Sequence, residues 1–196
     1  MIGAMGVQDD AEQFQPANLA EWSAWLAAHH DDTPGVWLVT HKQSTGRAAF
    51  DYEAAVIEAL RWGWVDSTQR TVDDQRTMMW YAARRPGSVW TRRNKVRVAA
   101  LEAAGRMQPA GQAAVEAARA SGMWTLMDDV EDLVVPDDLA TALAARPGAR
   151  EHWGAFPPSA RKQALAWIVL AKRDETRAAR VADVAASSAR GERPRA

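Results

Sequence analysis

The stretch WVDSTQRTVDDQRTMMWYAA, residues 64–83, predicts the β-structure on which the fold of this chain depends. Its first part, residues 64–71, has the extended character of a strand, and an acidic turn separates it from a second strand near residues 76–84. Within residues 77–83 apolar side chains occupy both alternating sets of positions. Because alternating positions point to opposite faces of a sheet, we expect this strand to be covered on both sides.

The sequence on either side of this hairpin adds one more strand and a series of helices. Residues 36–42 follow a Pro-Gly break and predict a third strand. Asn18 and Asp51 are typical helix caps, and each precedes a run with apolar residues at helical spacing. The chain after the hairpin has helical patterning throughout. We therefore expect an α+β fold, with a small antiparallel sheet of about three strands packed by helices and followed by a helical C-terminal part.

Composition narrows the class of protein. The chain has 196 residues, 47% of them hydrophobic, with 24 basic and 25 acidic side chains and no cysteine. The apolar content predicts a folded chain, and the absence of cysteine excludes disulfides and thiolate chemistry. A net charge of −1 argues against nucleic acid as a partner. We expect no membrane span, and a cytoplasmic location because the N-terminus lacks the pattern of an export signal.

A tryptophan-rich turn is the most distinctive local feature. Trp62, Gly63 and Trp64 mark an abrupt change from helical to extended character, and Asp66 follows. Glycine allows the backbone to reverse tightly there. One interpretation is core packing, with both indoles buried and Asp66 bonded to turn amides. The other is an aromatic-walled pocket with Asp66 as its hydrogen-bond acceptor.

The segment from residue 84 to residue 97 contains basic residues and no acid. Its basic members are Arg84, Arg85, Arg92, Arg93, Lys95 and Arg97. Trp90 and Asn94 lie among them, where a helix is expected to begin, so free helix amides and arginine forks could hold a small anion. Two alternatives are a solvated face neutralised by the acidic residues at 128–138, and a nucleic-acid contact.

The sequence contains no motif of a known catalytic centre. A His-Glu-x-x-His pair, a Gly-rich phosphate loop and a Gly-x-Ser-x-Gly elbow are all absent, so we expect no metal and no cofactor. Two hypotheses remain. The first is a non-enzymatic binding module for a small anionic or aromatic ligand, and the second is an enzyme that uses Asp66 as acid or base and Arg84 or Arg97 to stabilise an anion.

Two stretches of the chain resemble a known family. The first runs from the motif ALRWGWVD at residues 59–66, through RRPGSVW at 84–90, to GRMQPAG at 105–111. The second combines PSARK at 158–162 with WIVLAKRDETR at 167–177. Their order and spacing are similar to those of the YdeI/OmpD-associated family, also described as bacteriocin-protection proteins. The resemblance implies a role in stress or bacteriocin tolerance but no reaction, and the second stretch resembles the family's C-terminal OmdA-type module.

These patterns predict how the chain is divided. We expect an α+β part with the hairpin at residues 14–125, a helical OmdA-like part at 126–190, and flexible ends at 1–13 and 191–196. We also expect Trp167 and Ile168 to be buried in the same helix, with a cost of about 3–5 kcal/mol for Trp167→Ala. The predicted ligand-binding residues are Trp62, Trp64, Asp66, Arg84, Arg85, Trp90, Asn94 and Arg97.

Overall fold

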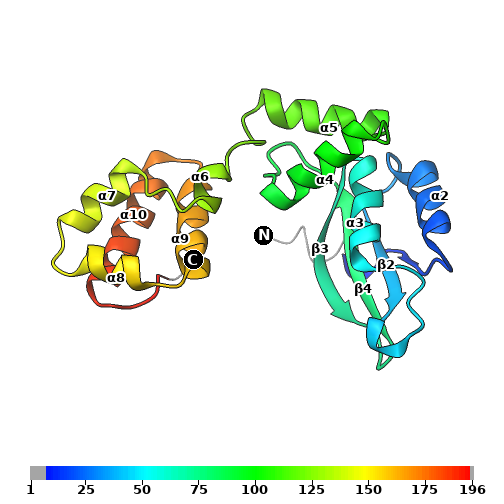
Figure 1. Ribbon diagram of the computed structural model, residues 1–196, viewed down its shortest axis with the longest axis horizontal. Helices are drawn as coiled ribbons and strands as arrows, with labels where there is room; N and C mark the ends of the chain where they lie inside the picture. The colour runs from blue at the N-terminus through cyan, green and yellow to red at the C-terminus, as the bar shows by residue number, and fades with distance from the viewer. Residues whose placement is uncertain (1–7, 195–196) are drawn as a thin grey trace. The chain divides into compact units, whose positions relative to one another are not determined.

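A four-stranded sheet with helices, followed by a helical part, forms the fold (Figure 1). The structure is a computed structural model that describes residues 8–194. Residues 1–7 and 195–196, which belong to the two ends expected to be flexible, lie outside the described residues. The α+β class with a helical C-terminal part is confirmed.

The three predicted strands are β2 (Val36–His41), β3 (Trp64–Thr71) and β4 (Arg76–Ala83). Strand β4 lies between the other two and pairs antiparallel with both. The expectation of an antiparallel sheet of about three strands is incomplete, because β1 (Gln13–Phe14) pairs parallel with β2 and gives the order β1-β2-β4-β3. A strand of two residues is too short to produce a periodic signal in the sequence.

Two helices cover one face of this sheet (Figure 1). Helix α2 (Leu19–His29) begins after Asn18, whose side chain accepts a hydrogen bond from the backbone of Glu21, and helix α3 (Tyr52–Arg61) begins after Asp51. Buried aromatic rings fill the space beneath them. Trp22 packs on Trp25 and on Tyr81 of β4, with ring centroids 5.5 and 5.3 Å apart. Apolar burial of this size is the main force that holds helix to sheet.

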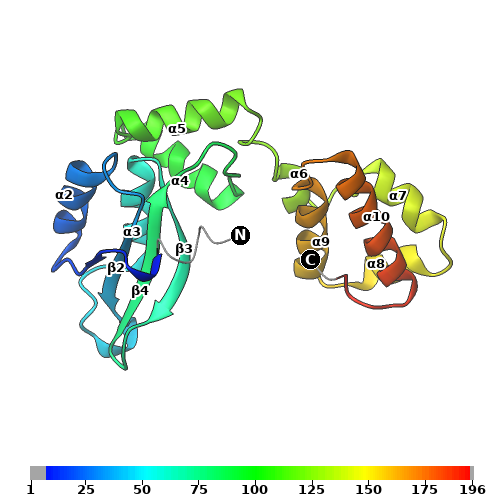
Figure 2. The same cartoon turned by 180° about the vertical axis from the view of Figure 1, so that it is seen from behind.

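Figure 2 shows the sheet from the side opposite α3. That face carries a second aromatic pair. Trp37 and Trp80 lie edge to face with centroids 5.4 Å apart, and both are buried. The Trp37 indole donates to the backbone oxygen of Gln8 at 2.7 Å, and Arg70 lies over its ring. Residues 8–13 fall within the segment expected to be a flexible end, and their contacts hold them against the sheet. The central strand is therefore buried on both faces at Trp80 and Tyr81, while its other residues are partly buried or exposed.

The chain divides into two compact units. The first runs to Ser88 and resumes at Arg93–Ser121, so it includes most of α4 (Arg92–Ala103) and all of α5 (Pro109–Ala120). The second comprises Val89–Arg92 and the chain from Gly122 onward. Its helices are α6 (Asp128–Glu131), α7 (Asp137–Ala144), α8 (Ala149–Ala155), α9 (Pro158–Val169) and α10 (Asp174–Ala189).

The second unit has its own apolar core. Leu139, Leu165, Ile168 and Val184, from three different helices, are buried within it. The expectation for Ile168 is confirmed, but the one for Trp167 is wrong: its side chain is only partly buried and packs against the edge of this core. The run around Trp167 is apolar on almost all sides, so the sequence pattern does not distinguish the buried face of α9 from its margin.

Candidate functional site

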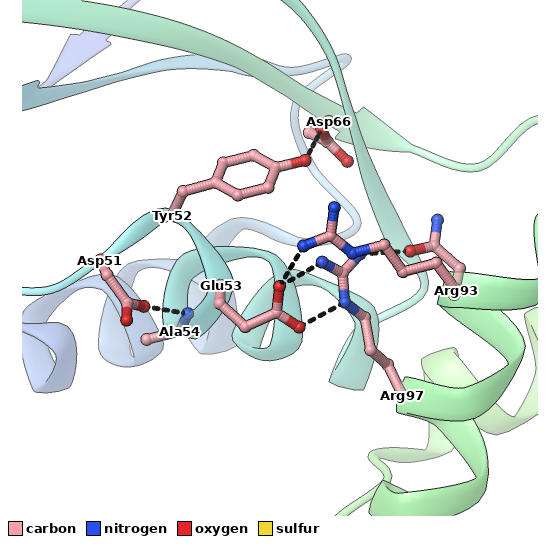
Figure 3. Close-up of polar contacts among 8 residues, drawn as sticks. Asp51, Tyr52, Glu53, Ala54, Asp66, Arg93 and Arg97 are labelled. Carbon is pink, nitrogen blue, oxygen red and sulfur yellow. Dashed lines mark hydrogen bonds and ion pairs between the residues drawn. The ribbon is translucent and has the colours of Figure 1, made fainter. Parts of the chain in front are cut away.

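An ion pair between α3 and α4 is the centre of the polar network in the first unit (Figure 3). Glu53 lies in the first turn of α3, and Arg97 points toward it from α4. The Nε of Arg97 donates to one carboxylate oxygen of Glu53 at 2.6 Å, and its Nη2 donates to the other. Arg97 is 7% exposed and Glu53 is 41% exposed, so the contact joins a buried guanidinium to a partly exposed carboxylate. Arginine is suited to this geometry because its donors form a planar fork.

Two neighbours complete the network. Arg93 donates to the same Glu53 carboxylate at 2.9 Å, and the remaining Nη1 of Arg97 donates to the side-chain oxygen of Asn94 at 2.6 Å. The hydrogen bond from Arg97 lowers the pKa of Glu53 to about 2, and the same bond raises the pKa of Arg97. Glu53 therefore occupies the position that an external anion would take on the Arg97 fork.

A second contact links the start of α3 to the sheet. The Tyr52 hydroxyl donates to Asp66 on β3 at 2.6 Å (Figure 3). Partial burial and this hydrogen bond raise the pKa of Tyr52 to about 12. The phenol therefore stays protonated near neutral pH, and Asp66 acts as its acceptor. This fixes the ring of Tyr52 over the sheet.

The two tryptophans of the predicted turn, Trp62 and Trp64, lie in different environments. Trp64 is fully buried, stands edge to face with Trp25, and donates from its indole to the His30 backbone oxygen at 3.0 Å. Trp62 is partly exposed, and its ring lies 4.4 Å from that of His30. Between them Gly63 adopts a φ of 76°, the left-handed conformation that the predicted tight reversal requires. Trp64 is thus a core residue, and Trp62 lies at the margin.

The basic segment from residue 84 to residue 97 is divided between the two units. Arg92 belongs to the second unit, where it donates from its backbone to Glu131 at 2.9 Å and from its side chain to Asp132 at 2.8 Å. Trp90 is also in that unit and packs on Trp124 with centroids 5.1 Å apart. Part of the acidic stretch therefore neutralises part of the basic one, as one of the three interpretations expects.

Arg84 and Arg85 remain in the first unit with different exposure. Arg85 is exposed, whereas Arg84 is partly buried, and this burial lowers the pKa of its guanidinium to about 10 against an opposing effect of Asp66. The Arg97 side chain is buried against Glu53 and Asn94. Of the eight predicted residues, Asn94 and Arg97 meet directly, and Asp66 is close enough to affect the pKa of Arg84 and of Arg97.

A cavity of about 330 Å³ opens beside this network in the first unit. Strands β2, β3 and β4 form its floor, and the start of α3 with the preceding loop forms its wall. It is lined by Leu38, Thr40, His41, Lys42, Gln43, Phe50, Asp51, Tyr52, Ala55, Gln69, Thr71, Thr77, Met79 and Tyr81. None of the eight predicted residues belongs to this lining, although Tyr52 connects it to Asp66.

The cavity floor changes from polar to apolar along the strands. Thr40, Thr77 and Thr71 stand side by side in one row across β2, β4 and β3. The adjacent row on the same face places Leu38 beside Met79. The sequence does carry a signal for the polar row, since each of these threonines lies in a predicted strand. The sequence does not reveal how the strands are aligned, however, and only this strand register shows that the three threonines are neighbours.

The described part of the chain holds neither a candidate metal-binding cluster nor a helix that could span a membrane. Residues 8–194 hold no group of three or more histidine, aspartate or glutamate side chains arranged to bind a metal ion. Across the same residues, every helix is too short or too polar to cross a bilayer.

Two different family models match the two parts of the chain. A family model described as a domain of unknown function, DUF8412, matches residues 14–114, just over half of the chain. The chain belongs to the DUF8412 family. The model named OmdA, described as bacteriocin-protection, YdeI or OmpD-associated, matches residues 132–191. The YdeI/OmpD-associated resemblance is therefore confirmed for the C-terminal stretch, whereas the whole of the first stretch lies in the DUF8412 match.

The DUF8412 match contains every residue that lines the cavity and the whole Glu53–Arg97 network. The OmdA match covers the helices from α7 to α10. A search of curated proteins and a search of solved structures found no match.

Proposed function

We propose that the DUF8412 unit is a binding module for a small anionic or aromatic ligand, and that the cavity on its sheet is the binding site. The observation that supports this most strongly is the cavity itself. Its volume of about 330 Å³ is within the usual range for small-molecule pockets, and its lining combines apolar side chains with a few polar groups. Such a lining gives a ligand both affinity and a fixed orientation.

The same contacts favour binding over catalysis. In the enzymatic hypothesis Asp66 is the acid or base, and Arg84 or Arg97 stabilises an anion. Asp66 already accepts the Tyr52 hydroxyl at 2.6 Å, and the Arg97 fork is engaged by Glu53. Asp66 holds Tyr52, and Arg97 holds Glu53, the next residue along α3. Both groups therefore act as structural supports that hold the cavity wall in place.

A ligand screen on the full chain tests this proposal. Metabolites are added while the melting temperature is followed, since a ligand at about 100 times its dissociation constant adds about 2.7 kcal/mol to stability. For each compound that stabilises the chain, the melting experiment is then repeated with the Thr71→Trp variant, which places an indole in the cavity. Thr68→Trp is the matched control, because Thr68 is exposed on the same strand and lies outside the lining.

The expected result is that stabilisation disappears in Thr71→Trp and persists in Thr68→Trp. Hits that persist in both variants but are lost in Arg84→Ala would assign binding to the basic segment predicted from the sequence, and would contradict the cavity proposal. A screen in which no compound stabilises the chain would contradict a binding role.

We further propose that the ligand-binding unit contributes to a protective role in the cytoplasm, in line with the bacteriocin-protection description of the OmdA family. A strain that lacks the gene should be more sensitive to bacteriocins than its parent. Complementation with the intact chain should restore tolerance, and complementation with Thr71→Trp should not. Equal sensitivity of the deletion strain and its parent would contradict this role, and recovery of the chain outside the cytoplasmic fraction would contradict the location.

A further inference from the structure

We propose that the cavity ligand is a small monocarboxylate with an aromatic or bulky apolar body, whose carboxylate is bound by Lys42. This inference rests on the proposed binding function and specifies its ligand class.

Most polar groups of the lining are already engaged. The Tyr52 hydroxyl donates to Asp66, and the Thr77 hydroxyl donates to the Arg70 backbone oxygen at 2.9 Å. The Gln69 amide donates to Thr77 at 3.1 Å. The carboxylate of Asp51 accepts the backbone N–H of Ala54 at 2.8 Å as the helix cap. These groups shape the cavity and keep only part of their hydrogen-bonding capacity for a ligand.

Two basic side chains of the lining are different. Among residues 8–194 the Lys42 ammonium has no ion-pair partner, and Nδ1 of His41 is buried without a hydrogen-bond partner. The hydroxyls of Thr40 and Thr71 are likewise without a partner in this part of the chain. Thr71 is exposed and its hydroxyl can bond water, whereas the buried Nδ1 of His41 has a cost in free energy that a ligand group recovers. Hydroxyls both donate and accept, so the Lys42 ammonium, which only donates and carries a charge, determines that the complementary ligand group is an anion.

The type of anion follows from which cations are present. Among residues 8–194 no arginine lines the cavity, and the nearby forks are engaged: Arg97 by Glu53 and Arg76 by Asp73. Phosphate is usually bound by forked arginines or by several backbone amides, whereas a single lysine with hydroxyl donors matches one negative charge on two oxygens. Asp51 within the lining adds repulsion against a doubly charged group. A carboxylate fits these constraints better than a phosphate.

The rest of the lining defines the body of the ligand. Leu38, Met79 and Ala55 provide an aliphatic floor, and the rings of Phe50 and Tyr52 stand in the wall. The hydrogen bond to Asp66 fixes the Tyr52 ring, so this wall is preorganised. An apolar ring on the ligand buries its surface against these side chains, and methionine adds a favourable sulfur contact with an aromatic ring.

The test is isothermal titration calorimetry of the full chain with three probes: phenylacetate, its neutral analogue phenylacetamide, and inorganic phosphate. We expect phenylacetate to bind about tenfold more tightly than phenylacetamide, since charge-assisted hydrogen bonds exceed neutral ones by roughly that factor. We expect no binding of phosphate. Lys42→Met should remove the preference for phenylacetate and leave the affinity for phenylacetamide within about twofold. Lys162→Met, in the second unit, is the matched control and should change neither.

Each other outcome contradicts the inference. Equal affinity for phenylacetate and phenylacetamide would show that charge is not recognised, and it would leave the cavity proposal intact if Thr71→Trp abolishes both. Phosphate binding that Lys42→Met removes would assign the site to a phosphorylated ligand. Absence of phenylacetate binding, while other compounds stabilise the chain in a manner sensitive to Thr71→Trp, would refute the ligand class alone.

Discussion

Glu53 and Arg97 satisfy each other: the carboxylate at the start of α3 receives two donors from the guanidinium of α4, one of them at 2.6 Å. The exposed fraction is 41% for the Glu53 side chain and 7% for that of Arg97. The arginine is therefore the member that needs a partner, because its charge lies largely out of water. This pair fixes the first turn of α3, and the same turn carries Tyr52 into the cavity wall.

The first prediction concerns the stability supplied by this pair. Glu53→Gln removes the negative charge but keeps the shape of the side chain. We expect it to lower the free energy of unfolding by about 1–2 kcal/mol, as for a charge-assisted hydrogen bond whose acceptor is partly exposed. Glu102→Gln is the control, since Glu102 pairs with Arg119 on the surface and its loss should cost less than about 0.5 kcal/mol. Equal costs in urea denaturation would show that burial of Arg97 is unimportant.

The second prediction is the pH dependence of this contribution. Arg97 lowers the pKa of Glu53 from 4.5 to about 2 in the folded chain. A carboxylate whose pKa is lower in the folded chain than in the unfolded chain stabilises the fold at pH values above its unfolded-state pKa. This stabilisation is lost as the pH falls through the pKa of the folded chain. The difference in stability between the parent chain and Glu53→Gln should therefore be constant above about pH 5 and shrink between about pH 4.5 and pH 2. A difference that stays constant across this range contradicts the assigned pKa.

The third prediction compares two helical glycines. A Cβ at Gly111 would lie 2.1 Å from the Arg61 backbone oxygen, because α5 approaches the end of α3 closely there. Gly111→Ala should cost at least about 2 kcal/mol, since backbone must move to relieve the overlap. Gly154 in α8 has open space around it, and Gly154→Ala should stabilise the chain by about 0.5 kcal/mol through helix propensity. Thermal melts of both variants check this, and a stabilising Gly111→Ala would rule out the close approach.

The fourth prediction separates two neighbours in α9. Ile168 is fully buried in the core of the second unit, so Ile168→Ala should cost about 2–5 kcal/mol. Trp167 lies at the edge of that core with Arg180 over its ring at 5.1 Å. Trp167→Ala should cost about 1–2 kcal/mol, from partial burial and the lost cation–π contact. The reverse order of the two costs in chemical denaturation would contradict this description of α9.

Much of the fold could be predicted from local sequence signals. The hairpin at residues 64–83, the caps at Asn18 and Asp51, and the glycine reversal at Gly63 all depend on residues close together in the chain, and each is found as expected. Strand β1 could not be predicted in the same way. Its two residues gain order from pairing with β2, which is distant in the sequence, and from the packing of Phe14 on Trp22 and Trp25.

The candidate site was harder to predict for the same physical reason. The arginines between residues 84 and 97 are close together in the sequence, which predicts a binding site. Whether each arginine is available to a ligand, however, depends on partners far along the chain. Glu53 engages Arg97 across 44 positions, and Glu131 engages Arg92 across 39. The threonine row and Lys42 are unremarkable as sequence and become a site only through strand register. Long-range pairing of this kind leaves no local pattern.

The most direct test of the central claim, that the cavity of the first unit binds a small ligand, is a two-dimensional amide NMR titration of the full chain with phenylacetate. We expect concentration-dependent shifts at the amides of Thr40, Lys42, Tyr52 and Thr71, which line the cavity. Amides of Arg84, Arg85 and the second unit should remain unchanged. Shifts confined to residues 84–97 would contradict the account.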